Sequence, residues 1–474
     1  MVLMNADLLK YISFGSLALL VVVLVASTVV GAVWGASVAH SAVYSSPLFV
    51  ALWVVMLASA LLYIFNTPMR RVASSLFLHL AFAVVLAGAL VTYVAAERGT
   101  LALCKDAPPS SMFVTDDGLL AKFPFKVTLE HCAVEYYDDA VSPRNYTARI
   151  AVQPSVGDAE QASLSMNNVY DRAGYRFYLS AVDGDCVTLL VSRDSWGTSI
   201  AYAGFLLSVA GFVFLFVARN SQKRALMQRL VAVGYPRIKM PSSHWWQIVA
   251  SSLFFFVVIG YMGVRRWIDG GLFPVSNGAE VMMFIAWCAF LAVLFFRKNR
   301  SLAFGAFVLA FICAVVSLSS GVAASGPVQP VLRTPLLPLH VITIVLSYVF
   351  IGLLAVNALV SLVLYWRTGD YKRLENTAVS GRVMLYYATW LLMAGIFLGA
   401  AWANISWGRY WGWDPKEVWA LITLFICSFG FHTRSLPFMA RPLVFHCFCL
   451  AAFLVMLFTF FGVNYLLGGL HSYA

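Results

Sequence analysis

The sequence Trp402-Ala-Asn-Ile-Ser-Trp-Gly-Arg-Tyr-Trp-Gly-Trp-Asp-Pro-Lys-Glu417 decides how this chain is interpreted. It lies between two apolar runs, each close to the ~20 residues that a helix needs to cross a bilayer. Single tryptophans and tyrosines often anchor a protein at the membrane interface, and anchoring is the simpler interpretation. Four tryptophans and a tyrosine within one loop instead predict a flat, half-wet aromatic surface.

Small and basic residues accompany these aromatics. Gly408 and Gly412 let a large flat ligand approach the backbone, and Arg409 and Lys416 supply positive charge. A planar apolar ring that carries carboxylates fits this chemistry, and haem is the obvious candidate. The candidate catalytic surface consists of Trp407, Tyr410, Trp411, Trp413 and Asp414.

The end of the stretch also predicts a helix start. Asp414 can cap, Pro415 suits the first helical position, and Glu417 follows three residues after Asp414, as in a capping box. Asp414 is therefore also a candidate for a purely structural role.

Composition places the chain among membrane proteins. Of 474 residues, 61% are hydrophobic and 11% charged, and the mean hydropathy is +0.82. This composition predicts a polytopic α-helical membrane protein with about eleven transmembrane helices. The first apolar run lacks a persuasive cleavage site, so we expect a retained span. The expected spans are 11–33, 47–65, 75–96, 199–218, 246–264, 280–296, 302–323, 341–365, 383–402, 416–433 and 443–463.

The basic residues predict the orientation. When the loops are assigned alternately from Lys10, most Lys and Arg residues of the short loops fall on one side, the side of the N-terminus. By the positive-inside rule this side is cytoplasmic. The tryptophan loop and the C-terminus are then extracytoplasmic. The net charge of +11 follows from topology, so a nucleic-acid partner is excluded.

Residues 97–198 differ from the rest and divide the chain. They contain most of the 21 acidic residues, and alternating apolar positions near 125–130, 146–152, 175–179 and 187–191 predict strands. We expect a small, mainly β extracytoplasmic domain there. The expected divisions are 1–96 (three spans), 97–198 (the β domain), 199–245 (a span and a basic cytoplasmic loop) and 246–474 (the remaining spans, with a long inner loop at 366–382).

Three of the eight cysteines, Cys104, Cys132 and Cys186, lie in the predicted β domain. Three is an odd number, so at most one disulfide closes inside it.

Four histidines are candidate haem-iron ligands. His340 and His471 are expected at the outer face, on either side of the tryptophan loop in sequence. His79 and His432 are expected in the inner half of the membrane, where ionisable side chains are costly and usually functional. Two facing neutral imidazoles can ligate haem iron axially, so the sequence predicts two haem stations.

Other histidines have simpler explanations. A single interfacial histidine is usually a hydrogen-bonded packing residue, which suits His40, His131 and His244. His446 is a rival to His432 because it also falls near the inner face, and spacing alone does not separate the two.

The segment 407–417, followed by Val418-Trp-Ala-Leu-Ile-Thr and His432-Thr-Arg434, resembles the tryptophan-rich "WWD" signature of haem-handling proteins in cytochrome c maturation. Within that group it resembles the CcsA (ResC) subunit of the System II cytochrome c synthase. His340-Val-Ile-Thr-Ile-Val-Leu-Ser-Tyr348 and Gly469-Leu-His471-Ser-Tyr473 resemble the two outer-histidine segments of that family.

The N-terminal part resembles the partner subunit, CcsB (ResB). Pro124-Phe-Lys-Val-Thr-Leu and Gly174-Tyr-Arg-Phe-Tyr178 are similar to its outer domain, and His79-Leu-Ala-Phe is similar to its membrane histidine segment. Together the resemblances follow the order of a CcsB–CcsA fusion.

This resemblance implies a function. The chain would be a holocytochrome c synthase of a bacterial inner membrane that moves haem b outward without binding it covalently. It would attach the haem through thioether bonds to the CxxCH motif of an apocytochrome c, and thiol-reducing proteins are expected partners. His340 and His471 would ligate haem at the outer face, and His79 and His432 at the inner site. Arg409 or Lys416 would pair with the propionates.

Two alternatives remain from the sequence. One is a haem transporter or chaperone without ligase activity. The other is a membrane b-type cytochrome that transfers electrons between two permanent haems, but it does not explain the tryptophan loop or the β domain.

Overall fold

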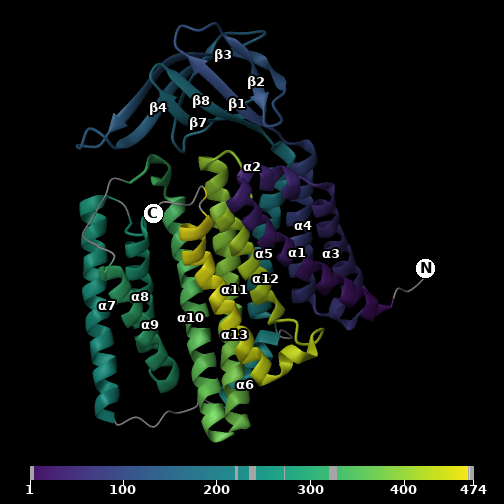
Figure 1. Ribbon diagram of the computed structural model, residues 1–474, viewed down its shortest axis with the longest axis vertical. Coiled ribbons are helices and arrows are strands. Elements are labelled where there is room, and N and C mark those ends of the chain that lie inside the picture. The colour runs from purple at the N-terminus through teal and green to yellow at the C-terminus, as the bar shows by residue number, and fades with distance from the viewer. Residues whose placement is uncertain are drawn as a thin grey trace.

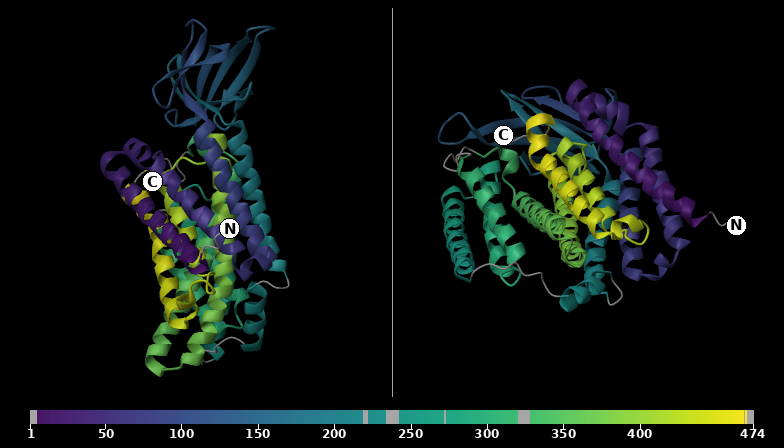
Figure 2. Two further views of the ribbon diagram at one scale, coloured as in Figure 1. Left: turned by 90° about the vertical axis from the view of Figure 1, so that its right-hand side faces the viewer. Right: turned by 60° about the horizontal axis from the view of Figure 1, so that its bottom comes forward.

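The computed structural model describes residues 5–218, 222–233, 242–271, 273–319, 328–467 and 469. A bundle of long helices has a β domain on one end (Figure 1). We call that end of the bundle the β-domain face and the other end the opposite face. The left view in Figure 2 shows the same division, with the strands gathered beyond the helix ends.

The helices come from both sides of the β domain in the sequence. Those before it are α1 (Ala6–Trp34), α2 (Ala36–Ala39), α3 (Pro47–Phe65) and α4 (Ala73–Ala95), with the π-helical turn η1 (His40–Tyr44) after α2. Those after it are α5 (Ser195–Val217), α6 (Gln222–Val233), α7 (Ser242–Gly270), α8 (Gly278–Phe295), α9 (Arg300–Ser319), α10 (Leu336–Thr368), α11 (Tyr371–Ser406), α12 (Pro415–Phe429) and α13 (Pro442–Leu457), which continues as the π-helix η5 (Phe458–Leu467).

The predicted fold class is confirmed. In the described residues, ten helices are long and apolar enough to cross a bilayer. The predicted span 416–433 does not reach that length, because its helix α12 has 15 residues. At 1.5 Å per residue, α12 is about 22 Å long, shorter than a ~30 Å hydrocarbon core.

Two segments that were predicted as loops contain helices. The expected long inner loop 366–382 is a two-residue turn, since α10 ends at Thr368 and α11 begins at Tyr371. Gly369 makes this sharp ending possible with a φ of 68°, and the Asp370 side chain accepts from the Arg373 backbone N–H. The basic loop 219–245 contains α6, which packs Leu226 and Leu230 against α11.

The β domain is one eight-stranded antiparallel sheet in the order β5-β4-β3-β2-β1-β8-β7-β6. The predicted strand regions fall in β3, β4, β7 and β8. The sheet curves until β7 contacts β4 and β5, so it nearly closes around an apolar core that includes Val127, Ile150 and Phe177. The strands are β1 (Glu97–Cys104), β2 (Ser110–Thr115), β3 (Leu120–Tyr136), β4 (Pro143–Pro154), β5 (Glu160–Ser165), β6 (Tyr170–Arg172), β7 (Tyr175–Asp183) and β8 (Cys186–Arg193).

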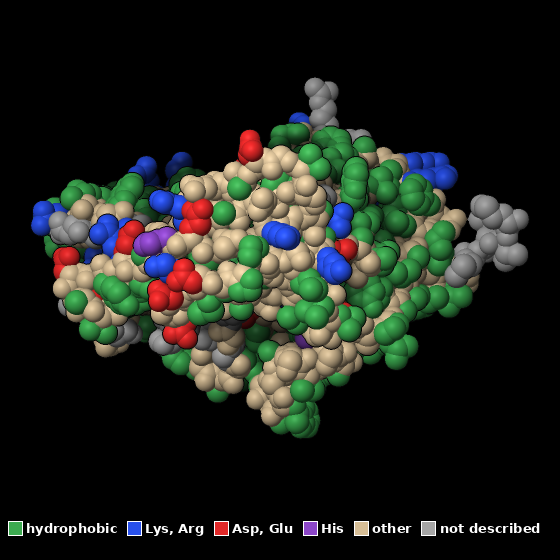
Figure 3. Space-filling model, turned by 90° about the horizontal axis from the view of Figure 1, so that it is seen from above, with side chains coloured by type: hydrophobic (Ala, Val, Ile, Leu, Met, Phe, Trp, Pro, Cys, Tyr) green, Lys and Arg blue, Asp and Glu red, His purple; other side chains and the backbone are tan. Residues whose placement is uncertain are grey.

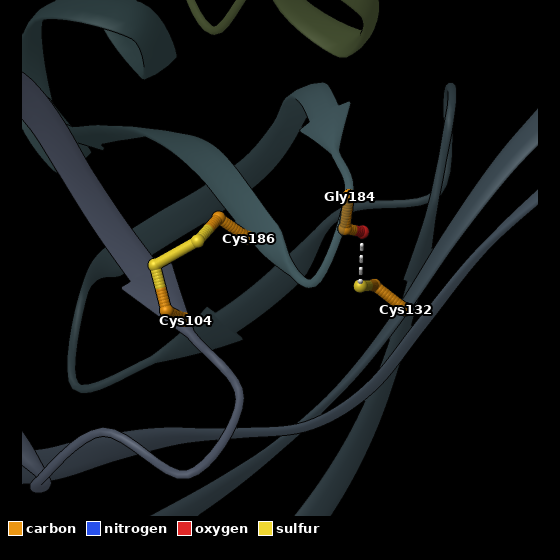
Figure 4. The surroundings of a disulfide bond; sticks show 4 residues. All are labelled: Cys104, Cys132, Gly184 and Cys186. Atoms are coloured by element: carbon orange, nitrogen blue, oxygen red, sulfur yellow. Dashed lines mark hydrogen bonds between the residues drawn. A yellow bond between two sulfur atoms is a disulfide. The ribbon is translucent and has the colours of Figure 1, made fainter.

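One disulfide closes within this domain, as the cysteine count allows. Cys104 and Cys186 are bonded and sit opposite each other on β1 and β8. Cys132 is a free thiol whose S–H donates to the Gly184 carbonyl at 3.5 Å (Figure 4).

The β domain also contacts the C-terminal part of the chain at the β-domain face. Asn167 donates to the Pro330 carbonyl at 3.2 Å and accepts from the Ser406 hydroxyl at 2.7 Å. The Arg333 guanidinium donates to the Tyr137 hydroxyl at 2.9 Å. Viewed from above, acidic and basic side chains are interspersed over the molecule, while hydrophobic side chains crowd its flanks (Figure 3).

Candidate functional site

The structure brings His79 and His432 together. His79 lies in the second turn of α4 and His432 follows the end of α12, both near the opposite face. Their ring centroids are 6.1 Å apart and the ring planes meet at 81°. The two residues are 353 positions apart in the sequence, so only the packing of the N-terminal and C-terminal helices unites them.

Both imidazole rings are held by the same kind of hydrogen bond to a nearby backbone carbonyl. The Nδ1 of His79 lies 2.7 Å from the Ser75 carbonyl, and the Nδ1 of His432 lies 2.9 Å from the Ser428 carbonyl. Each carbonyl belongs to the residue four positions earlier. A carbonyl only accepts, so Nδ1 carries the proton in each neutral ring and Nε2 keeps its lone pair. This tautomer is the one that binds a metal through Nε2.

Aromatic rings from α1 and α12 lie on the His432 side of this pair. The Phe14 ring packs edge-on against His432 at 5.3 Å between centroids and also approaches Phe429 at 6.2 Å. Both histidines are largely buried, but neither is fully enclosed. We call His79, His432 and Phe14 the histidine pair site.

His446 is arranged differently. Its side chain is fully buried, and Nε2 is bonded to the Leu374 carbonyl at 3.1 Å. Nε2 also lies 3.2 Å from the Thr377 hydroxyl. Its Nδ1 has no hydrogen-bond partner among the described residues. In His446 it is therefore Nε2 that is bonded to α11, whereas His79 and His432 bond through Nδ1.

His340 lies in the first turns of α10, at the β-domain face. Its Nδ1 is 2.7 Å from the Gly395 carbonyl of α11, which again leaves the lone pair on Nε2. Gly399 lies directly beneath the ring, because a Cβ added there would meet the ring atoms Cε1 and Nδ1 at 2.6 and 2.7 Å. The imidazole therefore occupies the space that a side chain at position 399 would fill.

The tryptophan loop crosses the same face between α11 and α12. Trp402 is buried in the last turns of α11 and meets Trp407 edge-on, with 4.7 Å between ring centroids. Gly408 has a φ of 73° and lies against the Tyr178 ring of the β domain, which a Cβ would meet at 3.0 Å. Glycine is required here both by its left-handed backbone and by this close approach.

Trp411 and Trp413 form the centre of the loop, with 5.8 Å between their ring centroids and planes at 87°. The indole N–H of Trp411 is buried and has no hydrogen-bond partner among the described residues. A buried N–H that no protein group accepts can donate to an acceptor from outside the protein, such as a carboxylate.

The Tyr410 side chain contacts α4 and α5. It is 5% exposed, and its hydroxyl lies 2.9 Å from the Thr92 hydroxyl. Burial raises the pKa of the Tyr410 phenol, and the contact with Thr92 partly offsets this. The phenol is therefore neutral at physiological pH, and Tyr410 is held as a packing residue rather than exposed as an acid or base.

The predicted capping box is confirmed. The Asp414 carboxylate accepts from the Lys416 backbone N–H at 3.0 Å, while Glu417 accepts from the Asp414 backbone N–H at 3.2 Å. Glu417 also accepts from the Gly412 N–H at 2.8 Å. Asp414 is 5% exposed, so its position is that of a helix cap.

The two candidate propionate-binding cations differ. The Lys416 ammonium donates to the Asn464 side-chain oxygen at 2.6 Å and is thereby tied to η5. The Arg409 side chain lies over Gly412, where a Cβ would meet its Nε at 2.8 Å. In the part of the chain that the structure describes, no ion pair is formed by Arg409.

His471 lies outside the described residues. Gly469, two positions earlier in the sequence, is described and packs against the loop. A Cβ added to Gly469 would meet the Asp414 carboxylate at 2.5 Å.

Sequence analysis missed several residues that shape the site. Gly395 and Gly399 are spaced by four in the span 383–402, and this small-residue spacing was the available signal. Tyr44, Thr92 and Phe14 gave no signal, because they lie in apolar segments far from the loop in sequence. Only packing brings them to the histidines and tryptophans.

Comparisons with known proteins relate the N-terminal and C-terminal parts of the chain to two different families. A sequence model of the family described as "Cytochrome C assembly protein" matches residues 275–471, and one of the "ResB-like family" matches residues 68–192. The first match contains the loop and α10–α13. The second contains α4 with His79 and nearly the whole β domain.

Individual relatives point the same way. "Cytochrome c biogenesis protein CcsA" of Gloeobacter violaceus is 31% identical over 306 residues, which cover 50% of this chain and 88% of that protein. The protein of the same name from Chlamydomonas reinhardtii is 30% identical over 265 residues, 52% of this chain and 71% of that protein. "Protein NrfI" of Wolinella succinogenes is 34% identical over 220 residues, 44% of this chain but only 24% of NrfI. The chain is thus a multi-pass membrane protein of the cytochrome c biogenesis family, in which a ResB-like part and a CcsA part are joined in one polypeptide.

Proposed function

We propose that this protein is a cytochrome c synthase that receives haem at the histidine pair site and presents it at the β-domain face for attachment to an apocytochrome c. The observation that carries the proposal is the meeting of His79 and His432, each with Nδ1 fixed and Nε2 left to bind iron. Membership of the cytochrome c biogenesis family makes haem the expected substrate.

The spacing of the pair supports this assignment. An imidazole nitrogen lies about 2.0–2.1 Å from a bound zinc ion, so two nitrogens on opposite sides of one metal are about 4 Å apart. A centroid separation of 6.1 Å agrees with that spacing once the radius of each ring is added. Neither ring is fully enclosed, so a flat, apolar substrate can reach the pair after a small movement of its neighbours.

The β-domain face has features that fit a second station. The Nδ1 of His340 is fixed to Gly395, and the indole N–H of Trp411, which has no partner among the described residues, is a donor for a carboxylate. His471 is proposed as the second iron ligand and Arg409 as a propionate partner. Trp407, Tyr410, Trp411 and Trp413 would shape the loop that fixes the ring plane and excludes water, with Asp414 capping α12.

The proposed reaction adds each thiol of a CxxCH motif across a haem vinyl group. A carbon–sulfur bond forms at the vinyl carbon next to the ring, and the thiol proton ends on the terminal carbon. Nothing leaves and no net oxidation occurs, but the thiols must arrive reduced. Positioning of the two reactants accounts for much of the rate in such an addition. We place the protein in a bacterial inner membrane, with the β domain and the loop extracytoplasmic.

Co-expression with an apocytochrome tests this function. The host lacks its own maturation system, and the product is separated under denaturing conditions and stained for covalent haem. Stained cytochrome is expected with the full chain and is expected to disappear with His340→Ala. Bound haem without stained product would instead identify a haem transporter. Two haems that are permanently retained and reducible, without product, would identify an electron-transfer cytochrome.

A further inference from the structure

The ring of Trp413 is enclosed by two residues from the N-terminal part. Tyr44 stacks on it with 4.7 Å between centroids and 7° between planes. Phe49 meets it edge-on at 5.2 Å. Tyr44 and Phe49 are both aromatic, and stacked or edge-on contacts between aromatic rings stabilise a structure by more than the burial of their surface alone. The Trp413 ring is therefore occupied by protein contacts.

Tyr44 is itself rigidly placed. It is 6% exposed and ends the π-helical turn His40–Tyr44. Its hydroxyl lies 2.7 Å from the Ser27 hydroxyl of α1, and its ring packs against Phe49 at 5.8 Å. A short π-helical segment is rare and often marks a functional position.

The backbone of the loop needs such support at this point. Trp413 has a φ of 58°, a left-handed conformation that bulky residues seldom adopt. Strained backbone persists only where the surroundings hold it in place. The Tyr44–Trp413–Phe49 stack supplies that hold.

The N-terminal part also holds Tyr410, the residue that precedes Trp411 in the loop. Tyr410 contacts the Thr92 hydroxyl at 2.9 Å, and Thr92 donates to the Asp194 carboxylate at 2.7 Å. Thr198 donates to the same carboxylate at 3.0 Å. Trp411 thus lies between Tyr410 and Trp413, which are each held by residues from the N-terminal part of the chain.

We propose that Tyr44 is a positioning residue of the tryptophan loop: by stacking on Trp413 it holds Trp411 in the orientation that the β-domain face station requires. The N-terminal helices then complete a site that the C-terminal helices do not hold in shape alone. The role of this position in haem binding rests on the proposed function. The effect of Tyr44 on the loop itself can be measured without haem.

Limited trypsin digestion of the purified, haem-free full chain measures the loop directly. Arg409 is a cleavage site inside the loop and is half-buried. In Tyr44→Leu, which retains apolar volume but loses the flat ring, cleavage after Arg409 is expected to accelerate about tenfold. That ratio corresponds to about 1.4 kcal/mol. Cleavage at other sites and the melting temperature serve to show that the fold is intact.

Two control variants accompany it. Tyr44→Phe keeps the stack and loses only the contact with Ser27, so its cleavage rate is expected to stay within twofold of the parent. Trp34→Ala removes a 65% exposed aromatic at the same end of α1 and is expected to leave cleavage unchanged. Unchanged cleavage after Arg409 in Tyr44→Leu would overturn the proposal, whatever the protein does with haem.

The second measurement concerns haem. Haem is added to a His79→Ala/His432→Ala background, so that only the station at the β-domain face is titrated by its absorption spectrum. Tyr44→Leu is expected to weaken this binding about tenfold, and Tyr44→Phe to restore it. If His340→Ala leaves the titration unchanged, the proposed function fails at this station, while the digestion still decides the role of Tyr44. Faster cleavage with unaltered haem affinity would overturn the positioning role.

Discussion

At the opposite face, His79 and His432 are each fixed by a carbonyl four residues earlier in the same chain segment. At the β-domain face, His340 depends on a carbonyl of another helix, and the tryptophan loop depends on Tyr44, Thr92 and Tyr178. The two histidines of the first site need only the packing of α4 against the end of α12. The second is assembled from many distant segments.

This difference has a mechanical consequence. A ring that bonds to its own helical turn keeps its tautomer and orientation when neighbours shift. A loop held by contacts from other elements changes shape when any of them is removed. We therefore expect substitutions near the histidine pair site to act through the ligand itself, and substitutions near the loop to act at a distance.

The largest effect is expected from His432→Ala. It removes one of the two proposed iron ligands, and haem recovered with the purified protein should fall more than tenfold, since even groups that merely support a ligand matter by about 10–100-fold. Imidazole added to the buffer should restore part of the absorption spectrum by filling the space. Normal haem content in this variant would show that the pair does not ligate.

Gly399→Ala tests the station at the β-domain face without touching a ligand. The new Cβ would meet the His340 ring at 2.6 Å, so the imidazole must move. Haem affinity in the His79→Ala/His432→Ala background is expected to drop about tenfold, because misplaced reacting groups are costly. The matched control is Gly15→Ala, a helical glycine with nothing within 4 Å, which should change nothing.

His446→Ala separates packing from ligation. The buried ring bonds to the Leu374 carbonyl, so its removal should lower the free energy of unfolding by about 2 kcal/mol, a typical cost for a buried site. The haem spectrum and the haem content should stay unchanged. Thermal unfolding and absorption spectra measure the two effects separately, and a loss of haem at unchanged stability would make His446 the ligand in place of His432.

The smallest effect is expected from Glu417→Gln. The amide oxygen still accepts from the Gly412 and Asp414 backbone N–H groups, but without a charge near the helix N-terminus. A loss of about 0.3–1 kcal/mol in unfolding free energy is expected. Glu417→Ala removes the acceptor as well and should cost more, about 1 kcal/mol. Equal stability in all three proteins would mean that the capping box does not hold the loop.

The sequence by itself determined the class of the molecule and much of its chemistry. Apolar runs of bilayer length predicted the helices, and alternation predicted the strands, because both patterns reflect local periodicity. The capping box at Asp414 and Glu417 was also predictable, since all its parts lie within four residues. The helical extension through 366–382 was missed because polar residues beyond the membrane do not reveal whether a helix continues.

Only the tertiary structure decided which distant residues meet. Sequence spacing left His432 and His446 equivalent, and packing distinguished them: one faces His79, and the other is bonded to α11. The same holds for Tyr44, which no local pattern connects to Trp413 across more than 360 residues. The reason is physical: helix and strand periods are encoded locally, whereas a site built from several elements exists only once their side chains pack together.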